Sequence, residues 1–368
     1  MNLKCILFVI VMLSVSGPLM SQTTLNPDIS LIGDFRVYSH NDTTHVEESE
    51  RFNLAVPSME LMVAGYLNPY ARADAVIGWH GEHNAEIEEL YGTVLRGLPL
   101  GMNLRVGKYL LEFGRLNSVH EHAWSFIMRP LPHEVFFGDH GLSDMAVRAG
   151  FLLPTGDAYT ELMLGTLKGD ALAGHHHEEP AEESPLRHPG FFGRLASSFA
   201  TSESAELALG GSVVNSVYEV ETSQLRTWLA GLDLKYKYKP SRYTILQVES
   251  EGIMRSEEQE GGDKLTSYGG YGYIDYRFRQ RYNIGGIFEY ARVRAGEHHH
   301  DDGEEEEVGV INVSDTWRAG LFLGFAPIEE TSLVRLAGHW TEPDDREGYW
   351  ELKLQFLFSL GPHQPHNF

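Results

Sequence analysis

Two short tracts rich in histidine and carboxylate are the clearest candidates for chemistry in this sequence. The first spans residues 174–179 and continues to His188, and the second spans residues 297–307. Neutral imidazole and carboxylate groups suit Zn²⁺, Cu²⁺ or Ni²⁺, and short His-rich tracts are typical of metal binding. We expect weak, multivalent capture of a divalent metal, with Zn²⁺ as the favoured ion and no required cofactor. The expected ligands are His175, His176, His177, Glu178, Glu179, His188, His298, His299, His300, Asp301 and Asp302. The alternative is a solvated acidic segment in which the histidines are incidental.

A third concentration of histidine and acid lies between residues 117 and 141. His120 and His122 would share one face of an extended segment, because side chains alternate there. Glu134, Asp139 and His140 follow. These side chains either line a solute path or pack their segment against a wall, and the sequence leaves both interpretations open.

The N-terminus predicts a signal peptide over residues 1–21, which leaves residues 22–368 as one domain. Lys4 supplies positive charge, and the apolar run over residues 5–15 is long enough for secretion but too short for a membrane span. The one cysteine, Cys5, would leave with this peptide, so we expect no disulfide. The net charge of -23 argues against a nucleic-acid partner and favours cations over anions.

The elements that must position these residues read as amphipathic strands. Over residues 349–360 every even position is large and apolar, whereas the odd positions are mostly polar. Residues 228–238 and 317–325 alternate in the same way. One apolar and one polar face, repeated along the chain, predicts a transmembrane β-barrel with lipid outside and water inside. A soluble β-sandwich also alternates, but it rarely needs so many such strands after a signal peptide.

The connections between strands predict the topology. We count about 16 antiparallel strands from residue 28 onwards, with 14 as the alternative and no separate plug domain. Short connections alternate with long ones, as in outer-membrane barrels with periplasmic termini. The His-rich tracts near 169–189 and 295–310 then fall in external loops. Residues 101–115 read as one strand whose phase changes near Gly107, which predicts a bulge there.

Alternation also predicts which charged side chains face the lumen. Because the expected set carries both signs, we expect pairing across neighbouring strands rather than a selectivity filter. The set is Asp233, Lys235, Lys237, Glu249, Glu251, Asp275, Arg277, Arg279, Glu289, Glu351 and Lys353.

One segment resembles known barrels. Gly107-Lys108-Tyr109, the run from Glu112 to Asn117, His120-Glu121-His122 and Pro130 resemble porin-like outer-membrane barrels of the phosphate-selective type. With the His-rich loops and the ending over residues 361–368, the chain is similar to short barrels labelled zinc-regulated TonB-dependent outer membrane receptors. The resemblance implies an outer-membrane protein of a Gram-negative-type bacterium, linked to zinc supply. It also implies that the loop after the fifth strand folds into the lumen and forms a constriction of His120, His122, Glu134, Asp139 and His140.

These patterns predict a porin-like outer-membrane channel for small solutes that captures and takes up divalent cations, zinc above all. The alternative is a non-conducting metal-binding or receptor barrel that acts with a partner. A TonB-type partner is not expected, because residues 22–368 cannot hold both a plug and a 22-stranded barrel. No nucleophile motif such as G-x-S-x-G is present, so we expect no enzyme. Expected partners are outer-membrane lipid and divalent cations, and a homo-oligomer is left open.

Overall fold

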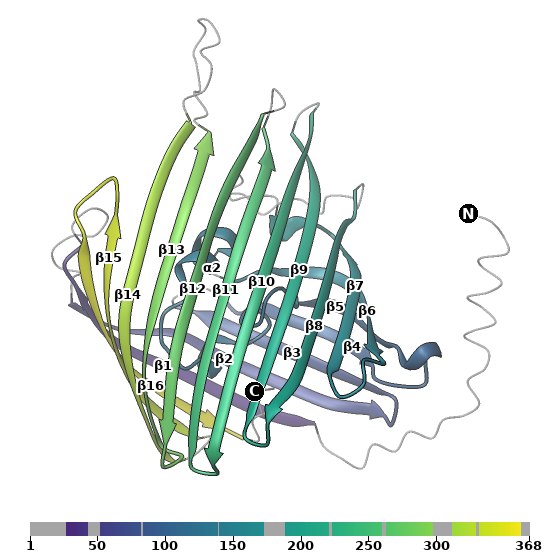
Figure 1. Ribbon diagram of the computed structural model, residues 1–368, viewed down its shortest axis with the longest axis horizontal. Coiled ribbons are helices and arrows are strands. Elements are labelled where there is room, and N and C mark those ends of the chain that lie inside the picture. The colour runs from purple at the N-terminus through teal and green to yellow at the C-terminus, as the bar shows by residue number, and fades with distance from the viewer. Residues whose placement is uncertain are drawn as a thin grey trace, which may run out of the picture.

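The chain forms one closed barrel of sixteen antiparallel strands, in which each strand pairs with the next and β1 pairs with β16 (Figure 1). The computed structural model describes residues 27–42, 52–81, 84–138, 140–172, 188–220, 223–259, 263–296, 311–328 and 331–361. The prediction of a 16-stranded barrel is confirmed, and the 14-strand alternative is wrong. Within these ranges no helix is long and apolar enough to cross a membrane.

The strand boundaries follow the predicted alternation of turns and loops. The strands are β1 (Asp28–His40), β2 (Phe52–Asn68), β3 (Ala71–His80), β4 (Glu86–Val94), β5 (Asn103–Leu110), β6 (Ser143–Leu153), β7 (Tyr159–Leu167), β8 (Gly190–Ser202), β9 (Ala205–Val220), β10 (Ser223–Ser241), β11 (Thr244–Glu258), β12 (Lys264–Phe278), β13 (Tyr282–Gly296), β14 (Ile311–Ile328), β15 (Ser332–Pro343) and β16 (Tyr349–Leu360). The helical elements are η2 (Pro99–Gly101), η3 (Glu121–Ala123), α2 (Leu131–Phe137) and η4 (Asp170–Leu172).

The outer surface of the barrel is an apolar belt. Leu232 and Leu321 lie in the middle of their strands and are 75% and 73% exposed. Large apolar patches of this kind are rare on protein surfaces that face water. Rings of Tyr276, Phe278, Tyr282 and Phe325 stack in sequence near the ends of β12, β13 and β14, as in an interfacial aromatic girdle. The belt therefore faces lipid.

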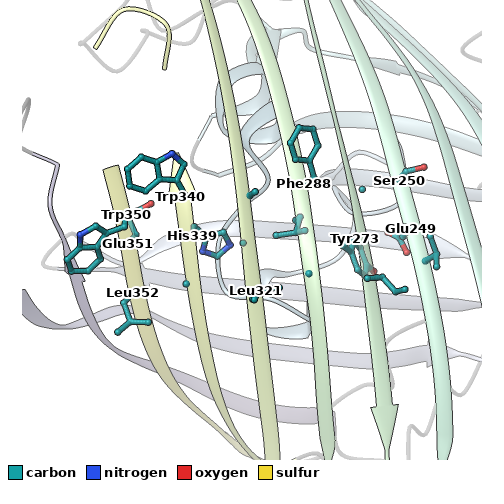
Figure 2. A pocket seen from close by; sticks show the side chains of 18 residues that line it. Glu249, Ser250, Tyr273, Phe288, Leu321, His339, Trp340, Trp350, Glu351 and Leu352 are labelled. Atoms are coloured by element: carbon teal, nitrogen blue, oxygen red, sulfur yellow. The ribbon is translucent and has the colours of Figure 1, made fainter. Parts of the chain in front are cut away.

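Figure 2 shows this outer wall from close by. A shallow apolar groove of about 970 Å³ lies across β11–β16 and is lined by Phe288, Leu321, Trp340 and Leu352 among others. On the same strands, the intervening side chains Glu249, Tyr273 and His339 are buried toward the barrel interior. The alternation read from the sequence thus separates a lipid-facing side from an inner side.

The wall is uneven in height. Strands β3–β7 contain 8 to 11 residues, whereas β9–β14 contain 15 to 19 (Figure 1). Residues 111–142, here called the constriction loop, connect β5 to β6 on the low side. Their helix α2 contacts β12 and β13 on the tall side. The constriction loop therefore crosses the barrel interior.

Apolar side chains hold the constriction loop against the inner wall. Trp124, Phe126 and Ile127 pack on inward-facing Tyr273 and Phe322, and all five are at least nine-tenths buried. A second cluster joins Phe113, Phe136 and Phe137 to the wall on the other side of the loop. Burial of aromatic side chains contributes roughly 2–3 kcal/mol each. The inner wall is therefore apolar at these contacts, where the loop covers Tyr273 and Phe322.

Two local predictions are wrong. The segment 101–115 is not one bulged strand, because β5 ends at Leu110 and its pairing with β4 and β6 runs without a register shift. Gly107 instead takes a φ of +141°, and a Cβ there would meet Leu90 O at 2.2 Å. Arg279 does not face the lumen, because β12 ends at Phe278 and Arg279 lies exposed in the following turn.

Candidate functional site: the constriction loop and the lumen wall

A buried carboxylate on β11 fixes the middle of the constriction loop. Glu251 Oε1 accepts hydrogen bonds from the backbone N–H groups of Leu116, at 3.0 Å, and Arg115. Its Oε2 lies 2.8 Å from Nε2 of His133, which is fully buried in α2. A carboxylate inside a protein is tolerated only when such partners compensate for lost hydration. Glu251, expected only to line the lumen, is thus an anchor of the loop.

Two arginines on β14 and β15 add further anchors. Arg318 of β14 lies 2.8 Å from Glu289 Oε2 and 3.1 Å from Glu134 Oε2 of the loop. Arg335 of β15 donates to the carbonyl oxygens of Phe126, at 2.9 Å, and Trp124. Burial raises the pKa of Glu134 above its ordinary value, and the nearby guanidinium of Arg318 opposes that shift. Glu134 therefore pairs with Arg318, while 35% of its side chain stays exposed.

The first half of the constriction loop meets the short wall at a group of six side chains, here called the His/Glu cluster: His80, Glu60, Glu88, Glu89, His120 and His122. Nδ1 of His120 lies 3.3 Å from Glu60 Oε2, and Nδ1 of His122 lies 3.2 Å from the same oxygen. The two rings stack with centroids 5.7 Å apart. His120 and His122 thus lie side by side, although not on an extended segment as predicted, because residues 121–123 form the 3-10 helix η3. The two imidazoles meet three carboxylates of the wall.

A break in strand alternation brings two consecutive glutamates into this cluster. Ile87 and Leu90 both face lipid, at 51% and 53% exposed, so Glu88 and Glu89 between them both turn inward. The β3–β4 pairing shifts at this point, from Val76 opposite Glu89 to Ile77 opposite Ile87. Such a bulge inserts one extra residue and re-aims side chains. Gly78 leaves the necessary space, because a Cβ there would meet Glu88 Oε1 at 1.9 Å.

Further contacts tie the wall carboxylates down. Nε2 of His80 lies 2.6 Å from Glu88 Oε1. Nε2 of His120 lies 3.2 Å from Glu89 Oε2, while Glu89 Oε1 accepts a hydrogen bond of 2.9 Å from the backbone N–H of Leu110. Burial disfavours the charged form of His120, but the carboxylates of Glu60 and Glu89 outweigh it and raise the pKa of His120 to about 10. The carboxylates of the His/Glu cluster therefore stabilise a positive charge placed between them.

The predicted lumen residues mostly form ion pairs. Lys235 faces Glu249 across neighbouring strands at 3.6 Å, as the pairing rule suggests. Asp275 and Arg277, at 2.8 Å, and Glu351 and Lys353, at 3.3 Å, pair within one strand instead. Lys237 is half-buried on β10.

Asp233 of β10 forms an ion pair with a residue of β8, so the pair spans the intervening strand β9. It lies 2.6 Å from Arg194 of β8 and 3.5 Å from Arg115 of the constriction loop. The intervening strand β9 carries Gly210 there, and a Cβ on Gly210 would meet Asp233 Oδ2 at 2.4 Å. The glycine makes room for the salt bridge.

The remaining predicted residues are partly placed. The ring of His140 lies 5.0 Å from that of His80, beside the His/Glu cluster. His188 precedes β8 and is half-buried. Asp139 and the tract residues His175, His176, His177, Glu178, Glu179, His298, His299, His300, Asp301 and Asp302 lie outside the described residues, as does the predicted signal peptide over residues 1–21.

The sequence analysis missed His80, Glu60, Glu88 and Glu89. The signal for the two neighbouring glutamates was present: in Glu-Ile-Glu-Glu-Leu, over residues 86–90, the apolar residues are spaced three apart instead of two. Glu60 carried no such signal, because nothing local distinguishes it from other charged strand residues.

The fold is that of known porins. The anion-selective porin of Comamonas acidovorans superposes with a TM-score of 0.61 and 8% identity, over 91% of this chain and 99% of that one. The channel DcaP of Acinetobacter baumannii gives a TM-score of 0.55 and 11% identity, over 92% and 99%. By sequence, an uncharacterized protein of Aquifex aeolicus is 28% identical over 95% of this chain and 81% of its own length. No family model matches the chain. With its lipid-facing belt, the protein is an outer-membrane β-barrel of porin-like fold, as predicted.

Proposed function

We propose that this protein is an outer-membrane channel for small solutes that captures divalent cations, Zn²⁺ foremost, and admits them to the lumen. The observation that carries the proposal is the His/Glu cluster. There the constriction loop brings the imidazoles of His120 and His122 onto three carboxylates of the wall. Imidazole with carboxylate is a donor set for zinc-like ions, whereas anions would be repelled.

Charge and architecture support passage through the lumen. A barrel of 16 strands generally leaves an aqueous interior. Here the constriction loop fills part of that interior, so we expect small solutes only. The net charge of -23 favours accumulation of cations at the surface and mouth. The His-rich tracts would add weak multivalent binding. The resemblance to zinc-regulated receptors, which rests on residues 107–130 together with those tracts and the ending over residues 361–368, makes zinc the first ion to test. We propose passive passage, without a TonB-type partner.

A second candidate is a closed barrel that binds metal and acts with a partner. The apolar packing of Phe126 on Tyr273 and Phe322 favours it, because a loop held by aromatic contacts and buried arginines does not swing aside readily. Under this alternative the lumen conducts nothing.

The distinguishing experiment is the reversal potential of the refolded protein in a planar bilayer under a KCl gradient. The proposal predicts discrete open steps and a reversal potential whose sign reports preference for K⁺ over Cl⁻. Anion preference would contradict the cation proposal, and folded protein without steps would favour the closed barrel. The comparison is the triple variant Glu60→Gln, Glu88→Gln, Glu89→Gln, which removes three negative charges from the lumen wall. We expect this variant to lose the preference for cations.

A further inference from the structure

We propose that Glu60, His120 and His122 form a built-in site for one divalent cation, Zn²⁺ by its donors, that fastens the constriction loop to β2. The proposal deepens the proposed function and rests on it for its role in transport. The site is distinct from the His-rich tracts: its three ligand atoms lie within 4.8 Å of one another in the described part of the chain.

The spacing of the donor atoms fits a tetrahedral ion. Zn–N and Zn–O bonds of about 2.0–2.1 Å place neighbouring ligand atoms about 3.3 Å apart on the edges of a tetrahedron. Glu60 Oε2 lies 3.3 Å from Nδ1 of His120 and 3.2 Å from Nδ1 of His122. Two of the three edges between the donor atoms therefore already have the length that a tetrahedral ion needs. The third edge, between the two imidazole donors, is at most 4.8 Å long, so binding would draw the two rings together.

The surroundings of His120 match those of a metal-ligating histidine. A ligating imidazole usually donates its second ring N–H to a carboxylate, which fixes the tautomer and the ring orientation. Nε2 of His120 faces Glu89 Oε2 at 3.2 Å, and the backbone N–H of Leu110 holds the other oxygen of Glu89. Nδ1 of His120 faces Glu60, so a metal ion that binds at this atom takes the place of the ring proton there.

A fourth donor stands close by. Glu88 Oε2 lies 3.8 Å from Nδ1 of His120, and contact of Glu88 Oε1 with His80 orients that carboxylate. Glu88 or solvent can complete the coordination. The bulge of β4 and the bare Cα of Gly78 bring Glu88 to this position.

The burial of the Glu60 carboxylate favours a bound cation at this site. Glu60 is 7% exposed, and its Oε2 accepts no well-oriented hydrogen bond among the described residues, although two imidazoles face it. A buried carboxylate is costly unless positive charge stands beside it. A divalent ion between Oε2 and the two imidazoles would supply that charge and would join the loop to β2. The ion then helps to set how far the loop stands from β2–β4.

The test is Zn²⁺ titration by calorimetry on the full folded chain, in a background with His175–His177 and His298–His300 replaced by alanine so that the tracts do not contribute. We expect one Zn²⁺ per chain. Glu60→Gln and His122→Asn should weaken it at least 100-fold, and Glu89→Gln about 10–100-fold, as for residues that orient a ligand. His40→Asn and Glu257→Gln, which lie away from the cluster, should leave it unchanged. Far-UV circular dichroism checks that each variant is folded.

Visible absorption of Co²⁺ bound in place of Zn²⁺ supplies a readout independent of transport. An intense d–d band that disappears in His122→Asn supports imidazole coordination here. If the background protein and its Glu60→Gln and His122→Asn variants bind Zn²⁺ with equal affinity, the proposed site is wrong. The His/Glu cluster is then a set of ion pairs that holds no metal. If the barrel conducts no ions but loses Zn²⁺ binding in these variants, the metal site is supported and the channel function is refuted. If the barrel conducts ions but binds no Zn²⁺, the channel function is supported and the metal site is refuted.

Discussion

Glu251 of β11 and His133 of α2 meet at 2.8 Å inside the barrel, between side chains that are almost wholly buried. The same carboxylate also receives two backbone N–H groups of the constriction loop. One residue of the tall wall thus holds both limbs of the loop. The position of the loop, and with it the free cross-section of the lumen, depends on this contact.

Glu251→Ala should therefore loosen the constriction loop. Removal of the carboxylate leaves His133 and two backbone donors unpaired in a buried site, which typically costs about 3–5 kcal/mol for a buried charged partner. Denaturant unfolding of the folded barrel measures the loss of stability, and single-channel recording should show larger or noisier steps. Unchanged midpoint and unchanged conductance would mean that the loop is held by its apolar contacts alone.

Arg318 and Glu134 should differ sharply in their tolerance of substitution. Arg318→Met leaves Glu289 and Glu134 without their cation, so we expect a loss of about 3–5 kcal/mol. Glu134→Gln should change stability by less than about 1 kcal/mol, because the Glu134 side chain is 35% exposed and solvent weakens its ion pair with Arg318. Denaturant unfolding of the two variants under the same conditions measures both changes in stability. Equal losses would contradict the conclusion that Arg318 anchors the loop more strongly than Glu134.

The lipid-facing belt makes a depth-dependent prediction. Leu321→Arg places a charge in mid-strand on a side chain that is 73% exposed, which should destabilise the barrel in a bilayer by about 2–4 kcal/mol. Leu100→Arg, at the exposed η2 turn, should cost at most about 1 kcal/mol. Folding titrations into lipid vesicles measure both. A similar loss at both positions would place the membrane boundary elsewhere.

Two adjacent glycines of β9 provide a matched test of the lumen salt bridge. Gly210→Ala directs a methyl group toward Asp233 and Arg194, with contacts of 2.4 and 2.7 Å, and should destabilise by about 1–3 kcal/mol. Gly211→Ala points outward and meets Leu232 only at 3.5 Å, so it should change stability by less than about 0.5 kcal/mol. Thermal unfolding of both variants decides the matter, since an inert Gly210→Ala would show that the Arg194–Asp233 pair shifts freely.

The sequence predicts the barrel well because strand alternation is a local property. The predicted first strand, residues 28–40, matches β1, and the apolar positions of residues 349–360 mark the lipid side of β16. The inner wall is harder to predict. Tyr273 and Phe322 face inward although they are apolar, because the constriction loop covers them. Nothing in local periodicity specifies which wall a 32-residue loop over 111–142 will contact.

The sequence predicted the histidines of the candidate site but not its carboxylates. His120 and His122 were singled out from their spacing, whereas the carboxylates opposite them come from strands distant in sequence. Glu88 and Glu89 both turn inward only because of a bulge, which breaks the alternation rule used to assign faces. Glu60 reaches the histidines through tertiary folding alone. Residues that converge from separate strands are visible only once register and loop path are known.

The central claim is that the constriction loop brings cation-binding groups to the lumen wall of a conducting barrel. The most direct measurement is single-channel current through the refolded chain at fixed voltage, with micromolar Zn²⁺ added to one side, compared with His122→Asn. The account predicts open steps that Zn²⁺ reduces in the parent chain and leaves nearly unchanged in His122→Asn. Open steps that ignore Zn²⁺ in both chains, or the absence of steps from verified folded protein, would contradict it.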